Sequence, residues 1–192
     1  MLRRVYDWVL GLAGHRYAMW FLAAISFVES SVFPIPPHPL VMLMVIARPQ
    51  RWLAIALVTI ASSVLGGMAG YALGAFLFDT VGRPVLEFYG QLDKFDLLAE
   101  EFNRYGAWAV LIAGMTPFPY KVITIFSGAT GLDFTVFSLA SLAARGAIFL
   151  IIAGLLRVFG PPIKSFIEER LGLMTTIFLV LLFGAFLLVR WL

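Results

Sequence analysis

Two hydrophobic segments of this chain are each interrupted by a Pro-x-Pro element. The first interruption contains Pro34, Pro36 and Pro37, and the second contains Pro117 and Pro119. Proline removes a backbone donor and clashes with the preceding helical turn, so neither segment can form one continuous helix. In lipid, a broken helix is tolerated only where protein or a water-filled cavity satisfies the freed backbone groups. Paired interruptions of this kind favour a transporter whose binding site lies between them.

The composition places these segments in a membrane. Hydrophobic residues make up 61% of the 192 residues and charged residues only 13%, with a mean hydropathy of +0.95. A soluble domain would lack enough polar side chains to cover its surface. The chain has no cysteine, which excludes disulfides and thiolate metal ligands. Basic residues gather at the ends of apolar segments, where they orient a membrane protein, so the net charge of +3 does not indicate nucleic acid.

We therefore predict an all-α polytopic membrane protein formed by a single domain, residues 1–192. Residues 17–47 are too long for one crossing and too short for two, which favours a re-entrant hairpin, and residues 107–131 repeat this pattern around the second interruption. The expected elements are an N-terminal amphipathic interfacial helix at 2–14, re-entrant hairpin 1 at 17–47, a transmembrane helix at 53–78, an outer loop at 79–106, re-entrant hairpin 2 at 107–131, and transmembrane helices at 134–156 and 171–189.

The distribution of basic residues predicts the orientation. Arg16 precedes the first hairpin, and Arg48 and Arg51 follow it, so both of its ends are expected in the cytoplasm together with the N-terminus. The acidic segment 79–106 is then outside. Each hairpin is followed by a transmembrane helix, and the second unit enters from the opposite side, which predicts an inverted repeat with two facing hairpins.

Three ionisable residues fall at membrane depth: Glu29, Lys121 and Arg145, with His38 beside the first interruption. Each charge at the centre of a helix costs about 2.5–3.5 kcal/mol, so these residues must pair or face water. One interpretation is a structural salt bridge from Glu29 to Lys121 or Arg145. The other is a cavity with excess positive charge that binds an anionic head group, with Glu29 as a proton acceptor.

Small residues in the long apolar segments indicate close helix packing. The candidates are Gly66, Gly67, Gly70, Gly74 and Gly146. His38 has only His15 as a histidine neighbour in the sequence, which does not indicate a metal site. No cofactor is expected.

Several motifs resemble those of the DedA superfamily, also called the VTT or SNARE-associated Golgi group, and most of all its short YqaA-like bacterial branch. They are Phe27-Val28-Glu29-Ser30-Ser31-Val32-Phe33-Pro34-Ile35-Pro36-Pro37, the Gly-Gly-x-x-Gly-Tyr-x-x-Gly run at 66–74, Thr116-Pro117-Phe118-Pro119-Tyr120-Lys121 with Gly128 and Gly131, and Arg145-Gly146. The resemblance implies a multi-pass protein of the bacterial inner (plasma) membrane. It also implies transport or scrambling of lipids, including phosphatidylethanolamine and polyprenyl phosphates, linked to the proton gradient.

The chain departs from the better-studied branch at three places. That branch has a second acid in the first hairpin and two arginines in the second. Here His38 stands nearest the acid's place, Lys121 replaces one arginine, and Gly114 or Met115 occupies the region of the other. Glu29 alone carries over unchanged.

Three function classes remain open. The first is a transporter or scramblase of phospholipid or polyprenyl-phosphate lipids, with membrane lipids of anionic head group as partners. The second is a small-ion or solute transporter, and the third is a non-transporting membrane scaffold. The sequence contains no zinc-protease, nucleophile-elbow or phosphate-loop motif, so no enzyme is expected. The oligomeric state is not indicated.

Overall fold

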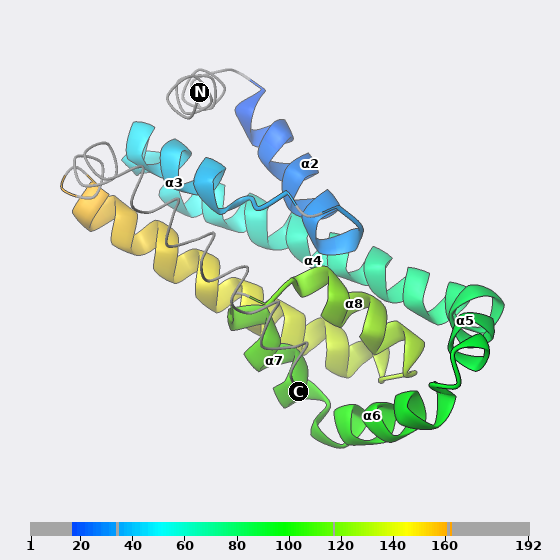
Figure 1. The fold of residues 1–192 in the computed structure, drawn as a ribbon. Helices are drawn as coiled ribbons and strands as arrows, with labels where there is room; N and C mark the ends of the chain where they lie inside the picture. The colour runs from blue at the N-terminus through cyan, green and yellow to red at the C-terminus, as the bar shows by residue number, and fades with distance from the viewer. Residues whose placement is uncertain (1–16, 34, 117, 161, 163–192) are drawn as a thin grey trace.

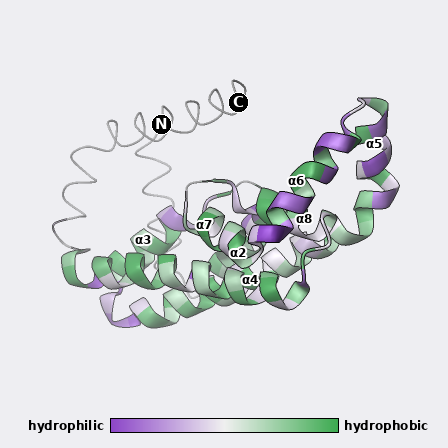
Figure 2. Cartoon of the chain, turned by 90° about the horizontal axis from the view of Figure 1, so that it is seen from below, coloured by the Kyte–Doolittle hydropathy of each residue, from purple (hydrophilic) through white to green (hydrophobic). Residues whose placement is uncertain are grey.

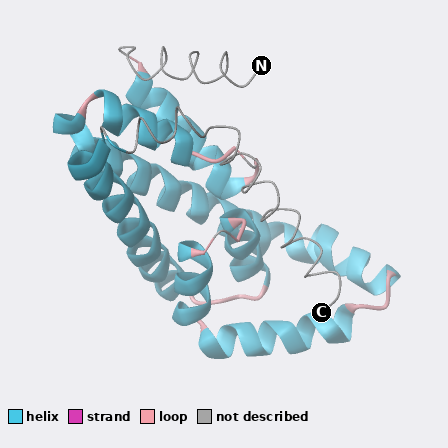
Figure 3. Ribbon diagram, turned by 60° about the vertical axis from the view of Figure 1, so that its left-hand side comes forward, coloured by secondary structure: helices cyan, strands magenta, loops and turns pink. Residues whose placement is uncertain are grey.

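The computed structural model describes residues 17–33, 35–116, 118–160 and 162, and every regular element in them is a helix (Figure 3). The helices are α2 (Ala18–Ser31), α3 (His38–Ala47), the 3-10 turn η1 (Pro49–Arg51), α4 (Trp52–Leu77), the π-helical turn η2 (Phe78–Gly82), α5 (Arg83–Phe88), α6 (Leu92–Tyr105), α7 (Ala107–Met115), α8 (Tyr120–Ala129) and a final helix, Phe134–Gly160. The all-helical prediction is confirmed for this part. The predictions for residues 2–14 and 171–189, and for Pro34 and Pro117, lie outside it.

Each proline interruption separates two short helices. α2 and α3 lie on either side of the first, with Pro36 in the break and Pro37 immediately before α3. α7 and α8 flank the second, and Pro119 immediately precedes α8. Proline suits this position because a helix needs no backbone donor there. The four helices have 14, 10, 9 and 10 residues, or roughly 13–21 Å at about 1.5 Å per residue.

Two longer helices follow the two breaks. α4 has 26 residues, and the final helix Phe134–Gly160 has 27; both are apolar and long enough to cross a membrane. They run antiparallel (Figure 1), as three contacts show. The Arg157 guanidinium lies over the Trp52 ring, Arg145 donates to Ser63, and the Tyr71 and Phe137 rings lie 5.1 Å apart.

The segment 79–106, expected as a loop, is largely helical. It contains most of η2, all of α5 and α6, and its polar residues make this end less apolar than α3 and α4 (Figure 2). In α6, Phe95 and Phe102 lie on the protein side and pack against Phe126 of α8. The many charges suggested a loop, but they occupy the exposed face of an amphipathic helix.

α4 is the centre of the fold, and both α2 and α8 pack along it (Figure 1). A Cβ atom at Gly66 would overlap the Phe27 backbone of α2, and one at Gly74 would overlap the Ile125 backbone of α8. Only glycine allows such close approach of two helices. Gly67 and Gly70 face two α8 side chains, Tyr120 and Thr124.

Gly146 does not fit the packing prediction. A Cβ atom there would meet no atom of the described residues within 4 Å. Ala144, two residues earlier and about half a turn round the helix, makes the close approach to α7 instead, because a Cβ atom at Gly114 would lie 2.8 Å from the Ala144 side chain. The spacing of small residues marked the correct helix but not the side of it that carries the contact.

Candidate functional site

Arg145 lies near the middle of the final helix and is the most buried charged residue of the described chain, at 3% exposure. Its Nη2 donates to Glu29 Oε2 over 2.9 Å, and its Nε donates to Ser63 Oγ over 2.6 Å. A buried charge of this kind persists only when it is paired and hydrogen-bonded. The pair connects the final helix to α2 and to α4.

Ser30 closes this network into a ring. Its hydroxyl donates to Glu29 Oε2 at 3.1 Å and lies 2.7 Å from Ser63 Oγ. Because the Ser30 proton is used on the carboxylate, Ser63 donates to Ser30. Hydrogen bonds therefore run from Arg145 through Ser63 and Ser30 back to Glu29, so each hydroxyl both accepts and donates.

Two aromatic rings cover the Arg145 guanidinium. Its Cζ lies 4.5 Å from the Tyr120 ring centroid and 4.9 Å from that of Phe149. His38 lies on the first turn of α3, and its ring centroid lies 5.1 Å from that of Phe149. Cation–π contacts of this kind add to the ion pair in a desolvated site. His38 thus borders the site through Phe149, and the described part holds no group of His, Asp and Glu that could bind a metal.

The two helix–break–helix units contact each other beside this network. Thr124 Oγ1 of α8 donates to the Ser30 carbonyl oxygen at the end of α2 over 3.0 Å and also lies 2.9 Å from the Lys121 carbonyl oxygen. The last turn of a helix leaves carbonyls without partners, and Thr124 satisfies one of them. This bond joins residues 94 positions apart in the chain.

Lys121 lies in a different environment from Arg145. It is half-buried in the first turn of α8, and its ammonium group has no ion pair or hydrogen bond with any residue the structure describes. Lys121 and Arg145 were the two predicted partners of Glu29, and Arg145 is the one that pairs with it. The positive charge left over is therefore that of Lys121.

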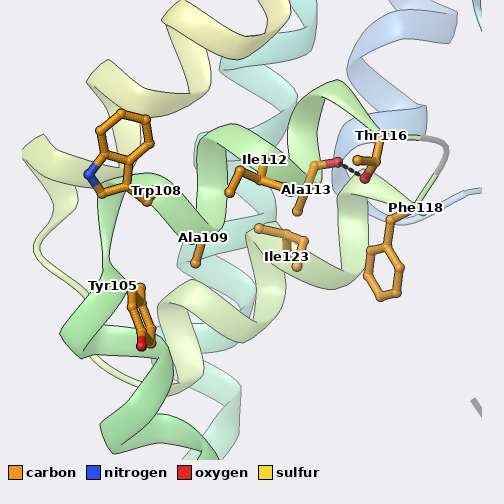
Figure 4. A pocket seen from close by; sticks show the side chains of 8 residues that line it. All are labelled: Tyr105, Trp108, Ala109, Ile112, Ala113, Thr116, Phe118 and Ile123. Carbon is orange, nitrogen blue, oxygen red and sulfur yellow. Dashed lines mark hydrogen bonds between the residues drawn. The ribbon is translucent and has the colours of Figure 1, made fainter.

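An apolar groove of about 420 Å³ runs along the second unit (Figure 4). Its lining residues are Tyr105, Trp108, Ala109, Ile112, Ala113, Thr116, Phe118 and Ile123. The Thr116 hydroxyl donates to the Ala113 carbonyl at 3.1 Å, so it offers little polarity to the groove. The groove extends from the end of α6 along α7 to the second break.

Sequence reasoning missed four features of this region. Ser63 and Phe149 contact Arg145, and Ser30 completes the hydrogen-bonded ring. Nothing in a single sequence distinguishes these residues from others in apolar helices. The groove was also missed, although the spacing of Tyr105, Trp108 and Ile112 by three and four residues was a usable signal for a shared face.

Comparison with known proteins identifies the family. The model of the VTT domain matches residues 35–158. An uncharacterized protein of Haemophilus influenzae is 32% identical over 151 residues, which cover 79% of this chain and 78% of the relative. An uncharacterized protein of Histophilus somni is 29% identical over the same shares. No solved structure matches the chain. This membrane protein therefore belongs to the VTT-domain family of the DedA superfamily.

Proposed function

We propose that this chain is a multi-pass inner-membrane transporter or scramblase of lipids that carry an anionic phosphate head group, such as phospholipids or polyprenyl phosphates. The observation that carries this proposal is Lys121, a half-buried cation at a proline break that has no ion pair in the described chain. The break adjoins an apolar groove. A free positive charge beside an apolar surface suits an amphiphile with a negative head group.

The proposed membrane placement rests on helix lengths. α4 and Phe134–Gly160 exceed the roughly 30 Å hydrocarbon core, whereas the helices on either side of each break reach only part of the way. Two such short helices suit a hairpin that enters and leaves on one side. The antiparallel long helices support entry of the two hairpins from opposite sides. Large apolar side chains that are highly exposed, such as Trp20 (75%) and Phe76 (80%), suit contact with lipid.

Glu29 is the proposed proton acceptor of the cycle. Its side chain is 15% exposed, whereas that of its partner Arg145 is 4% exposed. Protonation of Glu29 would remove the charge that holds Arg145 and would favour a second arrangement of α2 and the final helix. A change of this kind would couple movement of lipid to the proton gradient.

Lipid movement in liposomes tests the proposal. The purified protein is reconstituted, and the flipping of labelled anionic and zwitterionic lipids is followed with and without a pH gradient. Lys121→Ala is expected to slow anionic lipids, and Lys94→Ala, an exposed lysine of α6, serves as the matched control. Equal movement of anionic lipids by wild type and Lys121→Ala would reject a head-group role for Lys121.

The closed ring around Arg145 favours a second candidate, a non-transporting scaffold in which Glu29 and Arg145 only join helices. Such a scaffold predicts no lipid movement above that of protein-free liposomes for any lipid tested. Neither proposal assigns an enzymatic reaction to the chain.

A further inference from the structure

Four hydroxyl oxygens in the described chain are buried without a hydrogen-bond partner: those of Ser26, Tyr120, Ser138 and Ser141. Leaving a buried hydroxyl unsatisfied costs about 1–3 kcal/mol. Serine and threonine in a helix usually avoid this cost by donating to the carbonyl four residues earlier, as Thr59 and Ser127 do here. A polar ligand that hydrogen-bonds to these orphaned hydroxyls would remove this cost.

Two of these hydroxyls form a row with Arg145. Ser138, Ser141 and Arg145 are spaced by three and four residues, so they share one face of the final helix. At about 1.5 Å per residue, Ser141 lies roughly 6 Å from Arg145 along the helix axis and Ser138 roughly 10 Å. Ser138 is the only one of the three that is partly exposed, so the row runs from the buried pair toward the surface.

The Tyr120 hydroxyl lies beside the same row. It faces Gly67 of α4, 3.3 Å from where a Cβ atom would be. In the antiparallel register fixed by Ser63 with Arg145 and Tyr71 with Phe137, Gly67 lies opposite Ser141. The Tyr120 hydroxyl is near Ser141 but does not reach hydrogen-bond geometry with it. Three orphaned hydroxyls thus occupy one side of the pair. Ser26, on α2 one turn before Ser30, lies outside this row.

The opposite side of the pair is closed by apolar side chains. Phe149 and Ala153 continue the same helix and are fully buried, against Ile55 and Ala56 of α4. The buried Thr59 on this side is satisfied by its own helix, since its hydroxyl donates to the Ile55 carbonyl at 2.8 Å. The His38 ring borders this side 5.1 Å from the Phe149 ring, and Phe149 itself covers the guanidinium at 4.9 Å, so the imidazole meets the pair only through an apolar ring.

We propose that water reaches the Glu29–Arg145 pair from one side only, along Ser138, Ser141 and Tyr120, from the end of the final helix that begins at Phe134. The ligands are water molecules and the protons they carry. They satisfy the orphaned hydroxyls, and they give Glu29 a proton path to one face of the membrane in this conformation. This route rests on the proposed membrane function for its placement, but it holds for any lipid carried.

Cysteine accessibility tests the route, because the natural chain contains no cysteine. Ser138→Cys and Ser141→Cys are made singly, with Ala153→Cys as the matched control on the same helix. A small, charged, membrane-impermeant thiosulfonate is added to sealed vesicles from each side in turn, and labelling is measured by mass spectrometry. Thermal unfolding in detergent shows that each variant is folded.

We expect labelling at 138 and 141 from one side, faster at 138, and none at 153. Labelling from both sides, or none at 138 and 141, would overturn the one-sided route. Cysteines at the exposed positions Gln50 and Lys94 report the membrane placement separately. If those two label from the same side, the proposed topology fails, and the comparison of 138 and 141 with 153 still decides whether the row is hydrated.

Discussion

The Arg145 guanidinium donates to the Glu29 carboxylate over 2.9 Å, although 116 residues separate the two. The side chain of Arg145 is 4% exposed, so removal of the carboxylate would leave a buried charge without its counter-charge. The same pair joins α2, which precedes the first proline break, to the final helix, which follows the second. Its loss should therefore lower the stability of the packing between these helices.

Glu29→Gln is expected to destabilise the protein by about 3–5 kcal/mol, because it leaves the Arg145 charge buried without a counter-charge. Thermal unfolding in detergent measures this loss. The double variant Glu29→Gln with Arg145→Gln should cost less than the sum of the two single changes. Asp79→Asn is the control, since the exposed Asp79–Arg83 pair should contribute less than about 1 kcal/mol. Additive single changes would argue against direct coupling.

Lys121→Glu is expected to reduce the movement of anionic lipids more than that of zwitterionic lipids, because it places a negative charge at the proposed head-group site. Its melting temperature should stay close to that of the wild type, since no described residue pairs with Lys121. Lys121→Arg keeps the charge and should retain part of the activity. Equal losses for both lipid classes would point to a general defect and not to head-group recognition.

Gly74→Ala is expected to destabilise the protein by about 1–3 kcal/mol or more, because its Cβ atom would overlap the Ile125 backbone. Gly146→Ala is the matched control. Its Cβ atom meets nothing within 4 Å in the described chain, and alanine is favoured over glycine in a helix by about 1 kcal/mol. Unfolding temperatures of the two variants should therefore move in opposite directions. A similar loss at both positions would contradict the packing described for α4 and α8.

Tyr120→Phe should change stability little, because it removes a hydroxyl without a protein partner and keeps the ring over Arg145. Tyr120→Leu loses the cation–π contact and should be less stable than the phenylalanine variant by about 2 kcal/mol. Thermal unfolding compares the two. If phenylalanine costs as much as leucine, the hydroxyl and not the ring holds Arg145 in place.

Reporter fusions at Gln50 and at Lys94 should lie on opposite sides of the membrane, because α4 separates the two positions. The basic residues Arg48 and Arg51 predict that position 50 is cytoplasmic. An alkaline phosphatase fusion should be active only at 94, and a fluorescent protein fusion only at 50. Activity of one reporter at both positions would contradict the predicted inverted repeat.

The positions of the prolines and the lengths of the apolar runs were enough to predict where the helices break and which of them can span a membrane. Proline forbids a continuous helix by its own covalent structure, so α2, α3, α7 and α8 end or begin near the expected residues. The lengths of α4 and the final helix follow equally from uninterrupted apolar runs. The breaks and the helix lengths both depend on residues close together in the chain, so a single sequence is enough to predict them.

The identity of the base that pairs with Glu29 became clear only from the packing of the helices. Lys121 and Arg145 are equally costly at membrane depth, so their sequence positions could not rank them as partners. The choice depends on glycines in α4, where Gly66 lets the backbone of α2 come close and Ser63, one turn away, bonds the side chain of Arg145. Glu29 and Arg145 are 116 positions apart in the chain, so helix packing brings them together. Their residue types alone do not determine which charges meet.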